Sequence, residues 1–157
     1  MEISILIEEG LEVDLDAEWL QMVMEKTLIA EKVASSVELS LVLTGQQRIQ
    51  ELNRDYRGMD QPTDVLSFSL SEQKDGVPAP FIRPPDGVLH LGEVIISYPQ
   101  ALIQSRENGH SIKKEMAVLI VHGVLHILGY DHEKPEMEPA MQAREKEILE
   151  SLEKELI

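Results

Sequence analysis

Residues 113–128, KKEMAVLIVHGVLHIL, constrain the fold more than any other stretch of the chain. As a helix, this segment is apolar on nearly every side, and a helix of that kind has to be buried among other elements. Ser111 is a suitable N-terminal cap, and Gly129 can take the left-handed backbone that ends a helix. We therefore expect one central helix with the rest of the chain packed around it.

Shorter patterns predict the elements around this helix. β-branched or alternating apolar runs indicate four strands, at residues 2–8, 36–44, 65–70 and 92–97. Three-and-four spacing of apolar residues indicates further helices, at about residues 16–33, 45–56 and 99–108 and after Pro139. In the last of these helices, we expect Met141 and Ile148 to point inward and Glu145 to point outward. We predict the α+β class, a single domain over residues 1–157 with a small mixed four-stranded sheet packed with about five helices.

A proline-rich segment interrupts this pattern between the third and fourth predicted strands. Residues 74–87 hold four of the eight prolines of the chain. Because proline cannot donate a backbone hydrogen bond to a strand ladder, we expect a loop here, and we consider it a candidate for a mobile flap.

The composition excludes several kinds of site and compartment. The 157 residues include no cysteine, so disulfides and thiolate ligands are excluded, and any metal must bind nitrogen or oxygen. The formal net charge of −15 argues against a protein that coats nucleic acid through bulk electrostatics, but it is compatible with a local basic site. No apolar run approaches the roughly twenty residues of a membrane span, and the acidic N-terminus lacks a signal-peptide start. We expect a cytoplasmic protein without a membrane partner.

Three of the five histidines lie within HGVLHILGYDH, residues 122–132. On a helix, His122 and His126 lie on one face about 6 Å apart, so both can offer a nitrogen to one ion. A left-handed turn at Gly129 returns the chain toward that face, where His132 can supply a third nitrogen. Three imidazoles leave an open position on a tetrahedral zinc ion, as catalytic sites do. We predict that these histidines bind Zn²⁺, although the same ligands also accept nickel, copper or cobalt.

The same spacing occurs in metzincin metalloproteases, which gives a competing interpretation. A metzincin has a glutamate directly after the first histidine, where it acts as general base. Here that position is Gly123, so the usual proton acceptor for peptide hydrolysis is absent. Of the neighbouring carboxylates, Asp131 could orient a ligand, take a proton or only bond the backbone of a turn, and Glu115 is at best an outer-sphere candidate. His90 and His110 stand beside glycines without ligand spacing, and we expect them to face solvent.

A second informative stretch is YRGMDQPTDVLSFSL, residues 56–70. Its simplest interpretation is a helix that ends at Gly58, a turn, a local cap from Thr63 or Asp64, and then a buried strand. On spacing alone, Arg57 is a surface charge. Near a bound cation, however, an arginine can hold a phosphate through two hydrogen bonds and stabilise its developing charge.

Together, these two stretches resemble the YbeY family of bacterial ribosomal RNA maturation endoribonucleases. The matching residues are Arg57, Asp60, 62–68, 91–97 and 122–132. The resemblance implies a metal-dependent hydrolase domain with a zincin-like metal-site helix, and single-strand-specific cleavage of RNA. It implies a role in small-subunit ribosomal RNA 3′ end processing and ribosome quality control, with the ribosome or small-subunit assembly factors as partners. It also implies that His122, His126 and His132 bind zinc, and that Arg57 acts in catalysis together with His122.

The residues leave some questions open. A non-catalytic ribosome assembly factor with a structural metal would account for the acidic charge as well as an enzyme does. The cleavage position and the choice between attack by water and attack by the RNA 2′-hydroxyl do not follow from the sequence. Neither do the metal used in the cell, the oligomeric state or the role of residues 74–87.

Overall fold

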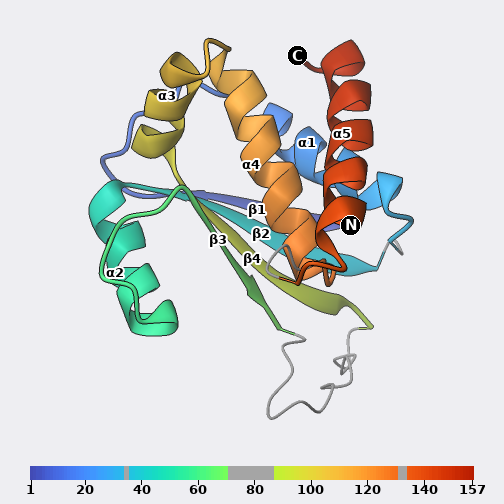
Figure 1. Ribbon diagram of the computed structural model, residues 1–157, viewed down its shortest axis with the longest axis horizontal. Helices are drawn as coiled ribbons and strands as arrows, with labels where there is room; N and C mark the ends of the chain where they lie inside the picture. Colours follow the sequence, from blue (N-terminus) through green and yellow to red (C-terminus); the bar gives the residue numbers. More distant parts are fainter. Residues whose placement is uncertain (34–35, 71–86, 131–133) are drawn as a thin grey trace.

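The computed structural model describes residues 1–33, 36–70, 87–130 and 134–157 (Figure 1). Within these ranges, it has four strands and five helices, which confirms the predicted α+β class. The strands are β1 (Glu2–Ile7), β2 (Val37–Thr44), β3 (Val65–Ser69) and β4 (Leu89–Ser97). The helices are α1 (Ala17–Ala30), α2 (Gln46–Arg57), α3 (Tyr98–Glu107), α4 (Ile112–Ile127) and α5 (Glu138–Glu155). The predicted proline-rich loop lies outside the described residues except for Gly87.

The four strands form one mixed sheet in the order β1-β2-β4-β3. β1 pairs with β2 and β2 pairs with β4 in parallel, whereas β3 pairs with β4 in antiparallel orientation. β4 begins at Leu89, before the predicted start at Gly92. Gly92 lies inside the strand, next to a shift in the β2–β4 register. β3 stands at the end of this order and is therefore an edge strand, which places the PTDVLSF segment at one side of the sheet.

The two faces of the sheet are covered differently. Figure 1 shows α1, α4 and α5 as a layer over one face, while α2 lies apart from them beside β3. Alternate residues of β2, such as Leu39 and Leu41, are fully buried under that helical layer, as the strand pattern predicts. On the opposite face, Ile49 of α2 forms a smaller cluster with Leu66 and Ile95. The main core therefore lies between the sheet and α4.

α4 occupies the centre of the main core, as its apolar sequence predicts. Met116, Ile120 and Val124 are fully buried, and most of the helix is inaccessible to solvent. The Ser111 hydroxyl accepts a hydrogen bond from the Lys114 backbone N–H at 3.1 Å, which confirms the predicted N-terminal cap. Among the described residues, no helix combines the length and the apolar character needed to cross a membrane.

Candidate metal centre

His122 and His126 lie side by side near the end of α4. Their ring centroids are 4.7 Å apart, and the ring planes meet at 65°. Both side chains are half-buried, although the helix around them is almost completely buried. The four-residue spacing therefore places two imidazoles on one side of the central helix, close enough to share an ion.

The backbone after α4 turns at Gly129, as predicted from the sequence. Gly129 has a φ angle of 109°, a conformation that side-chain-bearing residues rarely adopt. Its N–H donates to the carbonyl of His126 at 3.0 Å, and the N–H of Tyr130 donates to the carbonyl of Leu125 at 3.1 Å. These bonds satisfy carbonyls at the helix end. His132 and Asp131, which follow this turn, lie outside the described residues.

The described part of the chain therefore contains two of the three predicted metal ligands. No group of three histidine, cysteine, aspartate or glutamate side chains in residues 1–33, 36–70, 87–130 and 134–157 is placed to hold a metal ion. The assignment of His122, His126 and His132 as zinc ligands remains a prediction, and so does the role of Arg57.

Gly123 faces the sheet and not the histidine side of α4. A Cβ atom at this position would lie 2.6 Å from Cγ1 of Val94 and 3.2 Å from Oγ of Ser67. The carbonyl of Gly123 also accepts a hydrogen bond from the Ser67 hydroxyl at 3.0 Å. The two informative stretches of the sequence thus meet here, because Ser67 belongs to the PTDVLSF segment. A glutamate at this position, as in metzincins, would have no room for its side chain.

Glu145 of α5 contacts the first histidine of the motif. Its Oε1 atom lies 2.9 Å from Nδ1 of His122, and the two side chains are 23% and 29% exposed. The prediction that Glu145 points outward was wrong. Its spacing held the correct signal, since it follows Met141 by four residues and precedes Ile148 by three, and both of those residues are buried.

A neighbouring cluster ties the turn after α4 to two other helices. Arg144 of α5 pairs with Glu31, with Nη2 and Oε2 2.9 Å apart, and also donates to the carbonyl of Ala30 at 3.1 Å. Tyr130 lies beside the same carboxylate. Burial raises the pKa of the Tyr130 hydroxyl, and the nearby Glu31 carboxylate raises it further. The Glu31 carboxylate thus connects the end of α1, the turn at Gly129 and the first half of α5.

Glu115 does not belong to the histidine site, which corrects the suggestion that it lies in the outer sphere. Its side chain is 3% exposed and faces α3. It accepts hydrogen bonds from Gln104 at 3.1 Å and from Asn108 at 3.2 Å, and it lies 2.6 Å from Nε2 of His110. This carboxylate therefore anchors the start of α4 to α3.

The two isolated histidines are less exposed than predicted. The His110 side chain is 29% exposed and is paired with Glu115. The His90 side chain is 35% exposed, and its Nδ1 atom lies 3.2 Å from Oε1 of Glu38. The prediction that both face solvent is met in part: each ring is partly exposed, and one of its nitrogens lies against a carboxylate, Glu38 of β2 for His90 and Glu115 of α4 for His110.

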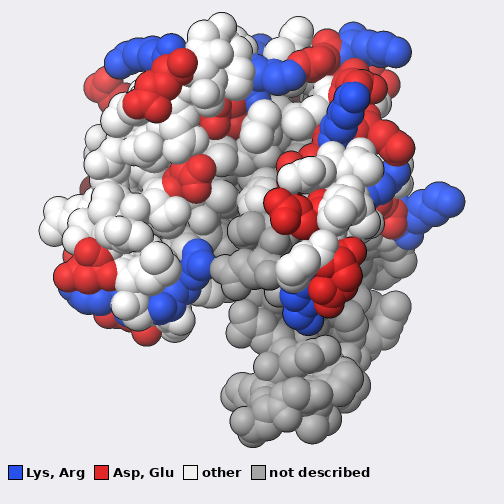
Figure 2. All heavy atoms as spheres, viewed as in Figure 1, with Lys and Arg blue, Asp and Glu red and all other residues white. Residues whose placement is uncertain are grey.

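Arg57 is the last residue of α2 and is exposed. Gly58 follows it in a left-handed conformation with a φ angle of 72°, which ends the helix as predicted. After the turn, Oδ1 of Asp64 accepts the N–H of Val65 at 2.8 Å, so the predicted cap before β3 is present. Figure 2 shows basic and acidic side chains mixed on the lobe at the lower left, where α2 lies in the same view of Figure 1.

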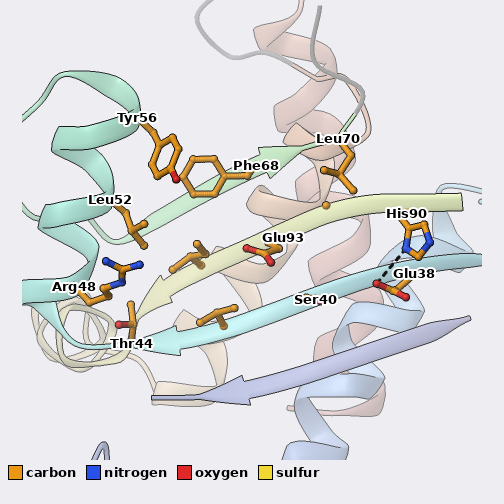
Figure 3. A pocket seen from close by; sticks show the side chains of 13 residues that line it. Glu38, Ser40, Thr44, Arg48, Leu52, Tyr56, Phe68, Leu70, His90 and Glu93 are labelled. Atoms are coloured by element: carbon orange, nitrogen blue, oxygen red, sulfur yellow. Dashed lines mark ion pairs between the residues drawn. The ribbon is translucent and has the colours of Figure 1, made fainter. Parts of the chain in front are cut away.

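A separate pocket of about 540 Å³ lies on the sheet face that carries α2 (Figure 3). Tyr56 and Phe68 form part of its wall, with ring centroids 5.2 Å apart. Because Val42 and Ile95 line it whereas their strand neighbours point into the main core, it is on the opposite face from α4. Its polar lining includes two carboxylates, Glu38 and Glu93, and a single arginine. That charge balance does not suit a polyphosphate chain. The pocket is therefore distinct from the histidine site in its lining as well as in its position on the sheet.

Comparison with known proteins identifies the family of the chain. The profile of the family described as "Endoribonuclease YbeY" matches residues 7–153. A protein named endoribonuclease YbeY from Dehalococcoides mccartyi strain CBDB1 is 47% identical over 148 residues, which cover 92% of this chain and 89% of that protein. A namesake from Moorella thermoacetica is 48% identical over 130 residues, covering 83% of this chain and 82% of that protein.

A solved structure shows the same architecture. The solution structure of TM1509 from Thermotoga maritima aligns with a TM-score of 0.61 and 29% sequence identity. The alignment covers 94% of this chain and 87% of that one. Since the family profile spans nearly the whole chain and relatives exceed 40% identity, the chain belongs to the endoribonuclease YbeY family, whose members are hydrolases that act on RNA.

Proposed function

We propose that this protein is a zinc-dependent, single-strand-specific endoribonuclease that acts in small-subunit ribosomal RNA 3′ end maturation and in ribosome quality control. The observation that carries the proposal is the pair of imidazoles at 4.7 Å on α4, followed directly by the left-handed turn at Gly129. Membership of an endoribonuclease family supplies the reaction class.

The donor set fits a zinc ion. Imidazole nitrogen is a common zinc ligand, and His122 and His126 offer two such nitrogens from one side of a rigid, buried helix. His132 is our candidate for the third. Imidazole nitrogens suit zinc better than magnesium or calcium, which prefer several carboxylate and carbonyl oxygens. When bound, the ion supplies Lewis acidity toward a phosphoryl oxygen and activates water near neutral pH.

The remaining roles fall to the chain itself. We assign Arg57 to hold and orient the scissile phosphate, because a guanidinium matches two phosphate oxygens and stabilises charge that develops on them. His122 and His126 would hold the ion that supplies Lewis acidity to the reaction, and we count His122 as catalytic for this reason. The absence of a carboxylate at position 123 means that a proton acceptor of the metzincin kind takes no part.

The acidic surface limits how the RNA is held. With a formal net charge of −15, long-range attraction of RNA is unfavourable, so basic contacts have to be local. α2 ends at Arg57, which is exposed, and we propose this arginine as such a local contact. We propose that the rest of the affinity comes from the ribosome or from small-subunit assembly factors that present the RNA strand.

The decisive experiment compares metal content and RNA cleavage in one preparation, with and without a chelator. His126→Ala should lose stoichiometric zinc and cleavage, while His90→Ala, which changes a histidine on the other side of the fold, should retain both. Arg57→Ala should keep zinc but cleave ribosomal RNA about 100- to 1,000-fold more slowly, since loss of one charge-stabilising donor costs about 3–4 kcal/mol. Arg54→Ala, in the same helical turn, is the matched control. Full nuclease activity in both purified site variants would show that a contaminating ribonuclease is responsible.

A non-catalytic assembly factor with a structural metal is the second candidate, favoured only by the acidic charge. The main core argues against it, because α1, α3, α4, α5 and the sheet bury a large apolar cluster, which stabilises the fold independently of an ion. A structural ion would make the protein unfold on chelation, whereas a catalytic ion leaves the fold largely intact.

A further inference from the structure

We propose that Glu145 is a positioning residue of the metal centre, whose carboxylate accepts the Nδ1–H of His122 and thereby directs the Nε2 atom of that ring toward the ion. The inference rests on the proposed function. It goes beyond it by assigning a role to a residue of α5, a helix that carries none of the predicted ligands.

The contact itself has the geometry of a charge-assisted hydrogen bond. The separation of 2.9 Å between Nδ1 and Oε1 is within the usual range for a donor to a carboxylate. Both side chains are less than one third exposed, so water competes only weakly for the two groups. A neutral imidazole has one donor nitrogen and one acceptor nitrogen. A carboxylate on Nδ1 therefore leaves the lone pair on Nε2, which is the nitrogen that a metal requires.

The helix that carries this carboxylate is held in place by contacts on both sides of Glu145. Arg144, the preceding residue, is fixed to Glu31 and to the carbonyl of Ala30 at the end of α1. Further along α5, Glu153 forms an ion pair with Lys114 at the start of α4. Because these contacts anchor α5 to two other helices, the backbone that carries Glu145 is held next to His122.

The second histidine packs against the ring from another direction. The His126 ring meets the His122 ring at 65° with centroids 4.7 Å apart. Glu145 and His126 thus both contact His122, one at Nδ1 and the other through its ring. Ligand orientation of this kind is what an outer carboxylate contributes to a metal site, and its loss usually weakens metal binding by about 10- to 100-fold.

The test compares Glu145→Ala, Glu145→Gln and the control Glu150→Ala, an exposed glutamate of the same helix. The zinc dissociation constant is measured by competition with a chromogenic chelator, and urea unfolding of the metal-free proteins checks the fold. We expect about 10- to 100-fold weaker zinc binding for Glu145→Ala. Glu145→Gln should lie between wild type and Glu145→Ala, because a neutral acceptor makes a weaker hydrogen bond. Glu150→Ala should bind as wild type does. Equal zinc affinity in wild type and Glu145→Ala would overturn the inference.

A second measurement does not need the metal. Nitrogen NMR of the His122 ring in the metal-free protein, at a pH where the ring is neutral, reports which nitrogen carries the proton. We expect the Nδ1–H form in wild type and a mixture of both forms in Glu145→Ala. An Nε2–H form in wild type would overturn the inference even if Glu145→Ala failed to fold. Absence of zinc binding by the wild type would overturn the proposed function as well, whereas zinc binding that is insensitive to residue 145 overturns this inference alone.

Discussion

A single hydrogen in place of a side chain sets the distance between α4 and the sheet at position 123. A Cβ atom there would lie 2.6 Å from a methyl group of Val94, which is itself fully buried. We predict that Gly123→Ala lowers the free energy of unfolding by about 1–3 kcal/mol, as overpacking of a core usually does. Urea unfolding monitored by circular dichroism measures the change.

The same contact offers its own control. Val94→Ala removes the methyl group that the new Cβ would meet, so the double variant Gly123→Ala/Val94→Ala should be more stable than the sum of the two single effects predicts. Strict additivity of the two substitutions would contradict the steric explanation.

Tyr130 gives a prediction about alkaline pH. Burial, followed by the Glu31 carboxylate, raises the pKa of its hydroxyl above the ordinary value of 10.0. A group whose pKa is raised on folding contributes stability that is complete below its unfolded pKa and disappears as the pH rises through the folded pKa. Wild type should therefore lose stability between about pH 8 and about pH 11, and Tyr130→Phe should lose less. Urea midpoints at both values measure this, with the exposed Tyr56→Phe as control. An identical loss in wild type and Tyr130→Phe would contradict the assignment.

At the scale of elements, Glu115 connects α3 and α4. Its buried carboxylate is surrounded by donors from Gln104, Asn108 and His110. We predict that Glu115→Ala lowers the free energy of unfolding by about 1–3 kcal/mol, because it removes a charged acceptor that three side chains share. Denaturant unfolding tests this against Glu107→Ala, an exposed substitution in α3. A loss below about 0.5 kcal/mol, the usual range for surface substitutions, would show that water replaces the carboxylate without cost.

Most elements of the fold follow from local patterns, and the exceptions are tertiary. The alternation of Leu39, Leu41 and Leu43 predicted β2, and the continuous apolar sequence of α4 predicted its burial. Periodicity does not identify which partner covers a polar side chain. The surroundings of Glu145 and Glu115 were therefore predicted wrongly, since each carboxylate contacts another helix: α4 for Glu145 and α3 for Glu115.

In the candidate site, too, some features follow from local spacing and others depend on tertiary contacts. The spacing of His122, His126 and Gly129 follows from helix geometry, so the pair of rings and the turn were predictable. The packing reason for Gly123 was not predictable, because it depends on Val94 of a strand that precedes α4 by two elements. The sequence could show that a glutamate is absent at this position, but only the fold explains why.

For the whole molecule, the question is how far the metal contributes to stability. The main core is formed from apolar side chains of the sheet and of α1, α3, α4 and α5, so the metal-free chain should fold cooperatively. An ion that binds only the folded state still adds stability by mass action. With free zinc at about 100 times its dissociation constant, the free energy of unfolding should rise by about 2.7 kcal/mol. His126→Ala should show little of this increase, while His90→Ala should show all of it. Urea unfolding with zinc and with chelator provides both values. A chelated wild type without a cooperative transition would mean that the ion is required for the fold, and an increase that persists in His126→Ala would place the ion elsewhere on the chain.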